Sequence, residues 1–104
     1  MIVVLGAAES GVGAAILAAA KGFEVFVSDK GEIKDSYKSL LAKHGIPYEE
    51  SQHTQERIFQ ATEVIKSPGI PDTVPLVKAL EERGIPVISE IEFAGRYTAA
   101  KIIG

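Results

Sequence analysis

Short apolar runs alternate with longer helix-like segments along the whole chain, and no other feature limits the fold as strongly. Extended segments are predicted at residues 2–5, 24–28, 46–48, 64–65, 87–88 and 101–103. Helices are predicted between them at residues 11–20, 34–44, 54–59, 73–83 and 89–97. Because a strand recurs about every 20 residues with a helix in between, we expect the strands to pair in parallel through right-handed crossovers.

Glycines and capping residues mark the ends of these segments. Three helix-to-strand joints share one design, a basic or histidine residue followed by glycine: Lys21-Gly22-Phe23, His44-Gly45-Ile46 and Arg83-Gly84-Ile85. Thr54, Thr73 with Pro75, and the capping box of Ser89 and Glu92 predict helix starts. The sequence therefore predicts one Rossmann-like α/β domain with a doubly wound, mostly parallel sheet of about five strands and helices on both faces.

Length and composition exclude several classes of protein. The chain has 104 residues, which fits one domain, and its 46% hydrophobic content can build a core. The net charge is −3 with the basic residues spread along the chain, so we expect no nucleic-acid partner. There is no cysteine for a disulfide or a thiolate metal site. With no signal peptide and no apolar stretch long enough for a bilayer, a cytoplasmic protein without a membrane partner is expected.

The turn after the first predicted strand is a G-x-A-x-x-G variant of the dinucleotide-binding fingerprint. Gly6 permits a sharp turn, Gly11 permits close packing of helix on strand, and the N–H groups at the helix start attract an anion. Ser10 offers an additional hydroxyl donor. Ala8 and Glu9 weigh against a dinucleotide, because they add a methyl group and a negative charge where a pyrophosphate would approach. A tight turn without a ligand remains the alternative.

Two more loops follow predicted strands, at the sheet edge where such folds bind ligands. Asp29 ends the second strand, where an acid in dinucleotide folds bonds a ribose hydroxyl, and Lys30 could face a phosphate. Asp29 could equally be a solvated turn residue. The third loop, Ser67-Pro68-Gly69-Ile70-Pro71, has two prolines around a glycine, which predicts a stiff loop suited to a binding wall.

Other polar residues are interpreted as structural. His44 is expected at a helix C-terminus, and His53 lies in a polar stretch assigned to the surface. Their separation gives no metal-ligand spacing. Capping accounts for Glu92, and no general base with a visible partner is found. The prediction is a domain that binds a ligand and has no catalytic residue.

Taken together, these loops resemble the N-terminal domain of a Mur ligase, a family of cytoplasmic enzymes that add amino acids to the peptidoglycan precursor. The resemblance covers essentially the whole chain and rests on the 3–6 strand and turn, Ser10-Gly11, Asp29, Ser67-Pro68-Gly69-Ile70 and the 84–92 segment. The last two stretches resemble the D-glutamate-adding members most.

The resemblance implies a ligand and a set of contacts. In that family this domain binds the UDP part of UDP-N-acetylmuramoyl-L-alanine. The turn of Glu9, Ser10 and Gly11 would meet the pyrophosphate, Asp29 and Lys30 would lie near the uracil, and Ser67, Pro68 and Gly69 would lie near the ribose. Glu9 and the lack of a basic residue at Gly31 depart from the family pattern.

The resemblance also implies a larger enzyme. ATP and Mg²⁺ would act in a central domain, activating the substrate carboxylate as an acyl phosphate that the amine of D-glutamate attacks. Residues 1–104 are then expected to be one UDP-sugar-binding domain of a three-domain ligase, inactive alone, with no cofactor of its own. Two alternatives remain open: the NAD-binding domain of an oxidoreductase, and a regulatory nucleotide-sensing domain.

Overall fold

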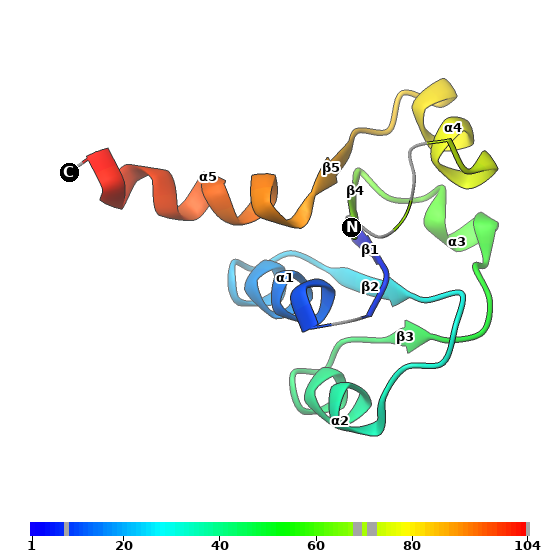
Figure 1. Ribbon diagram of the computed structural model, residues 1–104, viewed down its shortest axis with the longest axis horizontal. Coiled ribbons are helices and arrows are strands. Elements are labelled where there is room, and N and C mark those ends of the chain that lie inside the picture. Colours follow the sequence, from blue (N-terminus) through cyan, green and yellow to red (C-terminus); the bar gives the residue numbers. More distant parts are fainter. Residues whose placement is uncertain (8, 68–69, 71–72, 104) are drawn as a thin grey trace.

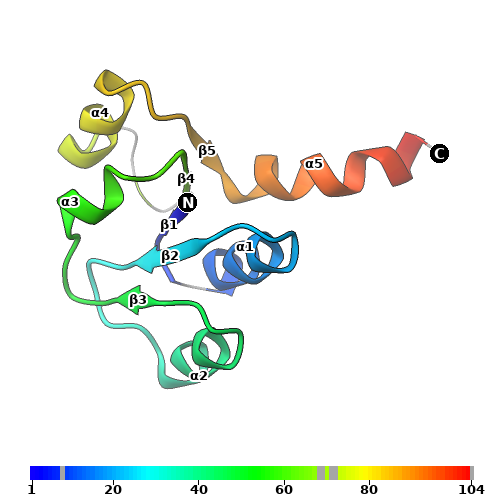
Figure 2. The same cartoon turned by 180° about the vertical axis from the view of Figure 1, so that it is seen from behind.

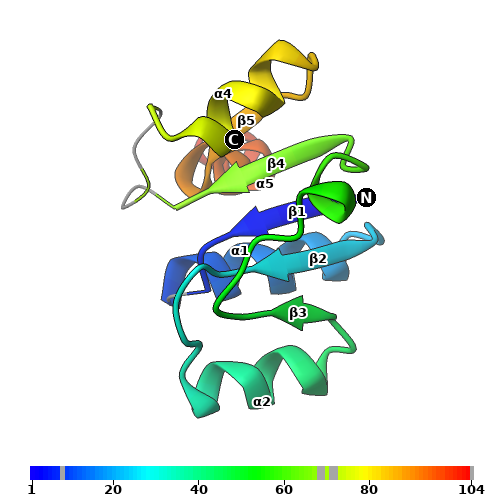
Figure 3. The same ribbon diagram turned by 90° about the vertical axis from the view of Figure 1, so that its right-hand side faces the viewer.

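The computed structural model describes residues 1–7, 9–67, 70 and 73–103, and these form a five-stranded sheet. Every paired strand is parallel to its neighbour, and the order across the sheet is β3-β2-β1-β4-β5. The arrows of β1 to β4 accordingly point the same way when the sheet is viewed across its strands (Figure 3). The predicted Rossmann-like, doubly wound α/β fold is confirmed.

The central strand β1 (Ile2–Leu5) shows why the sheet carries a hydrophobic layer on each face. All four of its residues are buried, as are the four of β2 (Val25–Ser28) beside it. Alternate side chains of a strand point to opposite faces. Ile2 and Val4 accordingly belong to one core cluster, while Val3 and Leu5 belong to the other. A parallel sheet covered on both faces explains why these strands read as continuous apolar runs.

Helices of unequal length cover the two faces. Residues of α1 (Glu9–Ala20), α2 (Asp35–Lys43) and α5 (Glu90–Ile103) supply one core cluster. Residues of α3 (Gln55–Ile58) and α4 (Pro75–Glu82) supply the other. Figures 1 and 2 show α1 and α3 on opposite sides of the central strands, with α5 extending away from the sheet toward the C-terminus. Three further strands complete the sheet: β3 (Tyr48–Glu49), β4 (Glu63–Lys66) and β5 (Val87–Ser89).

Two glycines let α1 approach the end of β1. Gly6 has a φ of +97°, which L side chains rarely adopt, so the chain can turn sharply at the end of the strand. A Cβ atom on Gly11 would lie 2.0 Å from the carbonyl oxygen of Gly6, so only glycine permits this contact between backbones. The roles predicted for both glycines are confirmed. The glycines at the three predicted joints also have positive φ angles: Gly22, Gly45 and Gly84.

Some predicted element ends are wrong. Residues 101–103 belong to α5 and do not form a last strand, because residues 98–103 contain no glycine or proline that would end the helix. Helix α4 begins at Pro75 with Val74 in the N-cap position, so Thr73 does not cap it. Ser89 does cap α5, because its Oγ accepts the N–H of Glu92 at 3.0 Å.

Candidate functional site

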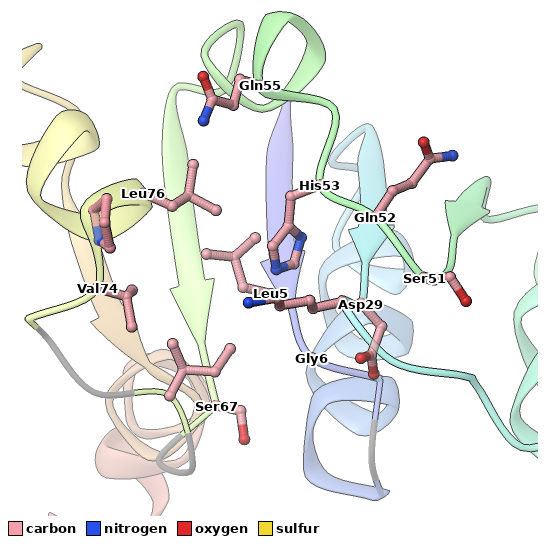
Figure 4. A pocket seen from close by; sticks show the side chains of 13 residues that line it. Leu5, Gly6, Asp29, Ser51, Gln52, His53, Gln55, Ser67, Val74 and Leu76 are labelled. Carbon is pink, nitrogen blue, oxygen red and sulfur yellow. The ribbon is translucent and has the colours of Figure 1, made fainter.

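A cavity of about 700 Å³ lies at the carboxyl ends of the strands, where the strand order reverses between β1 and β4. In open α/β sheets, this switch point is where ligands bind. Figure 4 shows its side chains converging from both sides of β1. One wall is mainly apolar and contains Leu5, Ile70, Val74, Pro75 and Leu76. The other wall is polar and contains Asp29, Lys30, Ser51, Gln52, His53 and Gln55.

Asp29 joins the loops that follow β1 and β2. Its Oδ2 accepts the N–H of Ala7 at 2.8 Å, and its Oδ1 accepts the N–H of Gly31 at 2.8 Å. The N–H of Gly6 bonds the carbonyl oxygen of Ser28 at 2.9 Å just beside them. Asp29 thus fixes the floor of the cavity, and each carboxylate oxygen keeps a second lone pair for a ligand hydroxyl.

The loop after β4 is tied back to the sheet through Ser67 and Ile70. Ser67 donates its N–H to the carbonyl oxygen of Leu5 at 3.1 Å, and its own carbonyl oxygen accepts the N–H of Ile70 at 3.0 Å. The ammonium group of Lys66 donates to the carbonyl oxygen of Ile70 at 2.5 Å. A Cβ on Gly6 would come within 3.0 Å of the Cβ of Ser67, so the loops after β1 and β4 are in contact.

The predicted site residues separate into three groups. Asp29, Lys30 and Ser67 line the cavity together, whereas Pro68 and Gly69 lie outside the described residues. The other three form the first turn of α1, with Glu9 and Ser10 exposed and Gly11 buried against Gly6, and they are not among the residues that line the cavity. Ser10 instead borders a smaller cavity of about 270 Å³ shared with α5. Contact of this turn with a pyrophosphate stays a prediction.

His53 lies half-buried in the cavity wall, within the exposed polar stretch that the sequence predicted. Its imidazole points into the cavity in Figure 4, and its Nδ1 lies 2.6 Å from the Oγ of Ser28. Ser28 is fully buried at the end of β2 and also donates to Oε2 of Glu49 at 2.8 Å. The sequence feature that could have indicated a place in the cavity is the position of His53 shortly after β3, because residues beyond the carboxyl end of a strand can reach the switch point.

Glu49 and Thr54 hold the His53 segment in place. Oε2 of Glu49 accepts the N–H of Thr54 at 2.7 Å, and Oε1 accepts the Thr54 hydroxyl at 2.5 Å. Thr54 occupies the predicted N-cap position of α3, but its hydroxyl bonds Glu49 and does not cap the helix. Ser51 has a φ of +59°, an uncommon conformation for a non-glycine residue, and its N–H bonds the carbonyl oxygen of Gly31 at 2.9 Å.

The electrostatics of this wall favour a neutral histidine beside an ionised glutamate. Burial lowers the pKa of His53, and Lys30 acts in the same direction, against the opposing influence of Glu49 and Asp29. Burial would raise the pKa of Glu49, but the hydrogen bonds from Thr54 and Ser28 outweigh it and hold that pKa below its ordinary value. His53 is therefore neutral at physiological pH and can act as a hydrogen-bond acceptor.

The described residues hold neither a metal-binding cluster nor a membrane-spanning helix. They contain no group of three or more histidine, aspartate or glutamate side chains placed to hold a metal ion. Among these residues, no helix has the length and apolar character that crossing a membrane requires.

The fold, with its cavity at the switch point of the sheet, is that of a Rossmann-like α/β domain. A family model for the MurD N-terminal domain matches residues 2–74. The chain belongs to the MurD N-terminal domain family. The resemblance to Mur ligases predicted from the sequence is thereby confirmed.

Individual relatives agree with this assignment. The chain is 65% identical over 102 residues to a UDP-N-acetylmuramoylalanine--D-glutamate ligase of Bacteroides fragilis, covering 98% of this chain and 23% of that protein. It is equally similar to the ligase of the same name from Bacteroides thetaiotaomicron, with the same coverage of both chains. The chain thus spans about a quarter of the length of these curated relatives. A murein peptide ligase structure from Psychrobacter arcticus shares the fold, with a TM-score of 0.81 and 22% identity over 91% of this chain and 20% of that chain.

Proposed function

We propose that this chain binds the UDP part of UDP-N-acetylmuramoyl-L-alanine, as the N-terminal domain of a cytoplasmic, ATP-dependent D-glutamate-adding ligase of peptidoglycan synthesis. Its 65% identity to ligases of that name supports the assignment of the whole enzyme. In this proposal ATP and Mg²⁺ belong to the central domain of the full-length enzyme, and the chemical step takes place outside this chain. The role of the chain is to hold the substrate by its nucleotide end.

The cavity at the switch point is the observation that carries the proposal. It has an apolar wall against which a nucleobase and a ribose can pack, and a polar wall whose side chains can form hydrogen bonds with them. Lys30 supplies a positive charge at its edge, and the N-terminus of α1 begins just beyond Gly6. A diphosphate would lie between these two features, with the base deeper along the cavity. This placement follows the reading of Lys30 as a phosphate partner and of Asp29 as a ribose partner, and it differs from the resemblance, which would put both residues near the uracil.

Asp29 and Ser67 would then act on the sugar. The Asp29 carboxylate is already oriented by two backbone N–H groups, so it can accept a ribose hydroxyl without first being ordered. Ser67 lies on the opposite side, next to Gly6. Glu9, Ser10, Pro68 and Gly69 complete the proposed contacts.

Calorimetric titration of the chain with UDP tests this proposal. Lys30→Gln should weaken UDP binding about two- to fivefold, the cost of one partly screened charge contact. Lys78→Gln is the matched control, because Lys78 is an exposed lysine on α4 outside the cavity lining, and it should change nothing. Equal affinities for the two variants would contradict the site, and tighter binding of NADH than of UDP would favour an oxidoreductase domain instead.

A further inference from the structure

We infer that His53 is a specificity-determining residue that selects the nucleobase: its Nε2 is held as a hydrogen-bond acceptor toward the cavity, and it favours a base with a ring N–H, such as uracil, over cytosine. This inference rests on the proposed function, because it requires a pyrimidine nucleotide in the cavity. It adds a residue that the sequence pattern did not suggest and a reason for the choice of base.

The tautomer of His53 follows from the partners of Ser28. The Ser28 hydroxyl has a single proton, and its Oγ lies 2.8 Å from Oε2 of Glu49 and 3.2 Å from the carbonyl oxygen of Gln52. Both of these oxygens are acceptors only, so the serine proton is directed to one of them, and the carboxylate is the nearer and stronger acceptor. At 2.6 Å from the same Oγ, Nδ1 of His53 must then be the donor.

A neutral imidazole with its proton on Nδ1 has a lone pair on Nε2. The ring lines the cavity and points into it (Figure 4), and its Nδ1 is taken by Ser28, so Nε2 is the ring nitrogen left to face the cavity. Glu49 is held by Thr54 and Ser28 together, which keeps the donor–acceptor chain in one direction. The arrangement offers an incoming base a fixed acceptor.

Uracil and cytosine differ at N3, the ring nitrogen that would face such an acceptor. Uracil has a ring N–H at N3, whereas cytosine has an unprotonated nitrogen there that accepts hydrogen bonds. Uracil would donate to Nε2 of His53, while cytosine would place two lone pairs against each other. Leaving a partly buried acceptor unpaired in this way corresponds to a loss of about tenfold in affinity.

Affinities for UDP and CDP, measured on the native chain and on His53 variants at about pH 7.5, test the inference. The native chain should prefer UDP by about tenfold, His53→Phe should reduce the ratio to near one, and His53→Gln should keep part of it through its amide oxygen. His44→Gln, a change at an exposed histidine beyond α2, is the control and should keep the full ratio. A native ratio near one, or an unchanged ratio in His53→Phe, would overturn the role of His53. No binding of UDP to the native chain would instead refute the proposed function.

A pH series on the native chain tests the same point without a substitution that could impair folding. Protonation would convert Nε2 into a donor, so the ratio of UDP to CDP affinity should shrink between about pH 7.5 and about pH 5.5. The charged groups that face the ring are Glu49 on β3 and the Asp29 and Lys30 pair after β2. Changes in phosphate charge affect both ligands alike and cancel in the ratio. A ratio that is constant with pH would contradict the inference.

Discussion

Replacing Gly11 with alanine should destabilise the domain, although alanine is the better helix former. In the interior of an exposed helix, Gly→Ala typically stabilises by about 0.5–1 kcal/mol, because glycine loses more backbone entropy on folding. At Gly11 the new Cβ would lie 2.0 Å from the carbonyl oxygen of Gly6, where roughly 3.4 Å is an ordinary carbon–oxygen contact. The first turn of α1 and the end of β1 would have to separate by more than about 1 Å.

The size of the effect follows from these opposing contributions. Overpacking against a neighbour costs about 1–3 kcal/mol, and here the neighbour is backbone that cannot rotate away, so the upper part of that range applies. After subtraction of the propensity gain, we expect Gly11→Ala to lower the free energy of unfolding by about 1–2.5 kcal/mol. For a domain of this size that corresponds to a fall in Tm of roughly 5–15 °C.

Gly13 provides a matched control two residues further along the same helix. It is exposed, and a Cβ there would meet no atom within 4 Å, so Gly13→Ala should gain about 0.5–1 kcal/mol. Urea unfolding followed by circular dichroism, with the slope of the transition unchanged, measures both variants against the native chain. The reasoning about α1 fails if Gly11→Ala is as stable as Gly13→Ala.

Three further predictions follow from the cavity. Asp29→Ala should lower the free energy of unfolding by about 1–3 kcal/mol, because two backbone N–H groups lose their acceptor. Asp35→Ala is the control: its carboxylate is fully exposed, and its loss should lower the free energy of unfolding by less than about 0.5 kcal/mol. Thermal unfolding measures both variants. The pKa values of His53 and Glu49 are both lowered, so stability should decline as pH falls below about 6.5 and again below about 4. Glu49→Gln should flatten the second decline in acid titrations followed by circular dichroism, and an unchanged profile would refute this assignment. Gly6→Ala should weaken UDP binding severalfold in calorimetry, because it strains a positive φ and pushes on the loop after β4; unaltered affinity would argue against a ligand at the switch point.

The fold was accessible from the sequence because local signals and the global architecture agree. The continuous apolar residues of β1 and β2 need cover on both faces, and the Gly6 turn places the first helix against the sheet. Ligands of such folds bind beyond the carboxyl ends of the strands, and strand–helix alternation alone indicates where those ends lie. This predicts a site that includes Asp29, Lys30 and Ser67, and the fold does bring these three residues together.

Three features were not accessible for physical reasons. His53 follows a strand of only two residues, β3, which gives no periodicity to mark the loop after it. Its partners, Ser28 and Glu49, come from two strands and meet only when the sheet forms. The extension of α5 to Ile103 depends on the absence of a stop signal, which is weaker evidence than a signal that is present.

Mapping UDP onto the chain by backbone amide NMR tests the central claim most directly. The claim predicts that millimolar UDP shifts the amides of Gly6, Asp29, His53 and Ser67, which surround the switch point, and leaves that of Lys43 at the far end of α2 unchanged. Chemical shifts that stay constant throughout, or that change only around the smaller cavity between α1 and α5, would contradict a nucleotide site between β1 and β4.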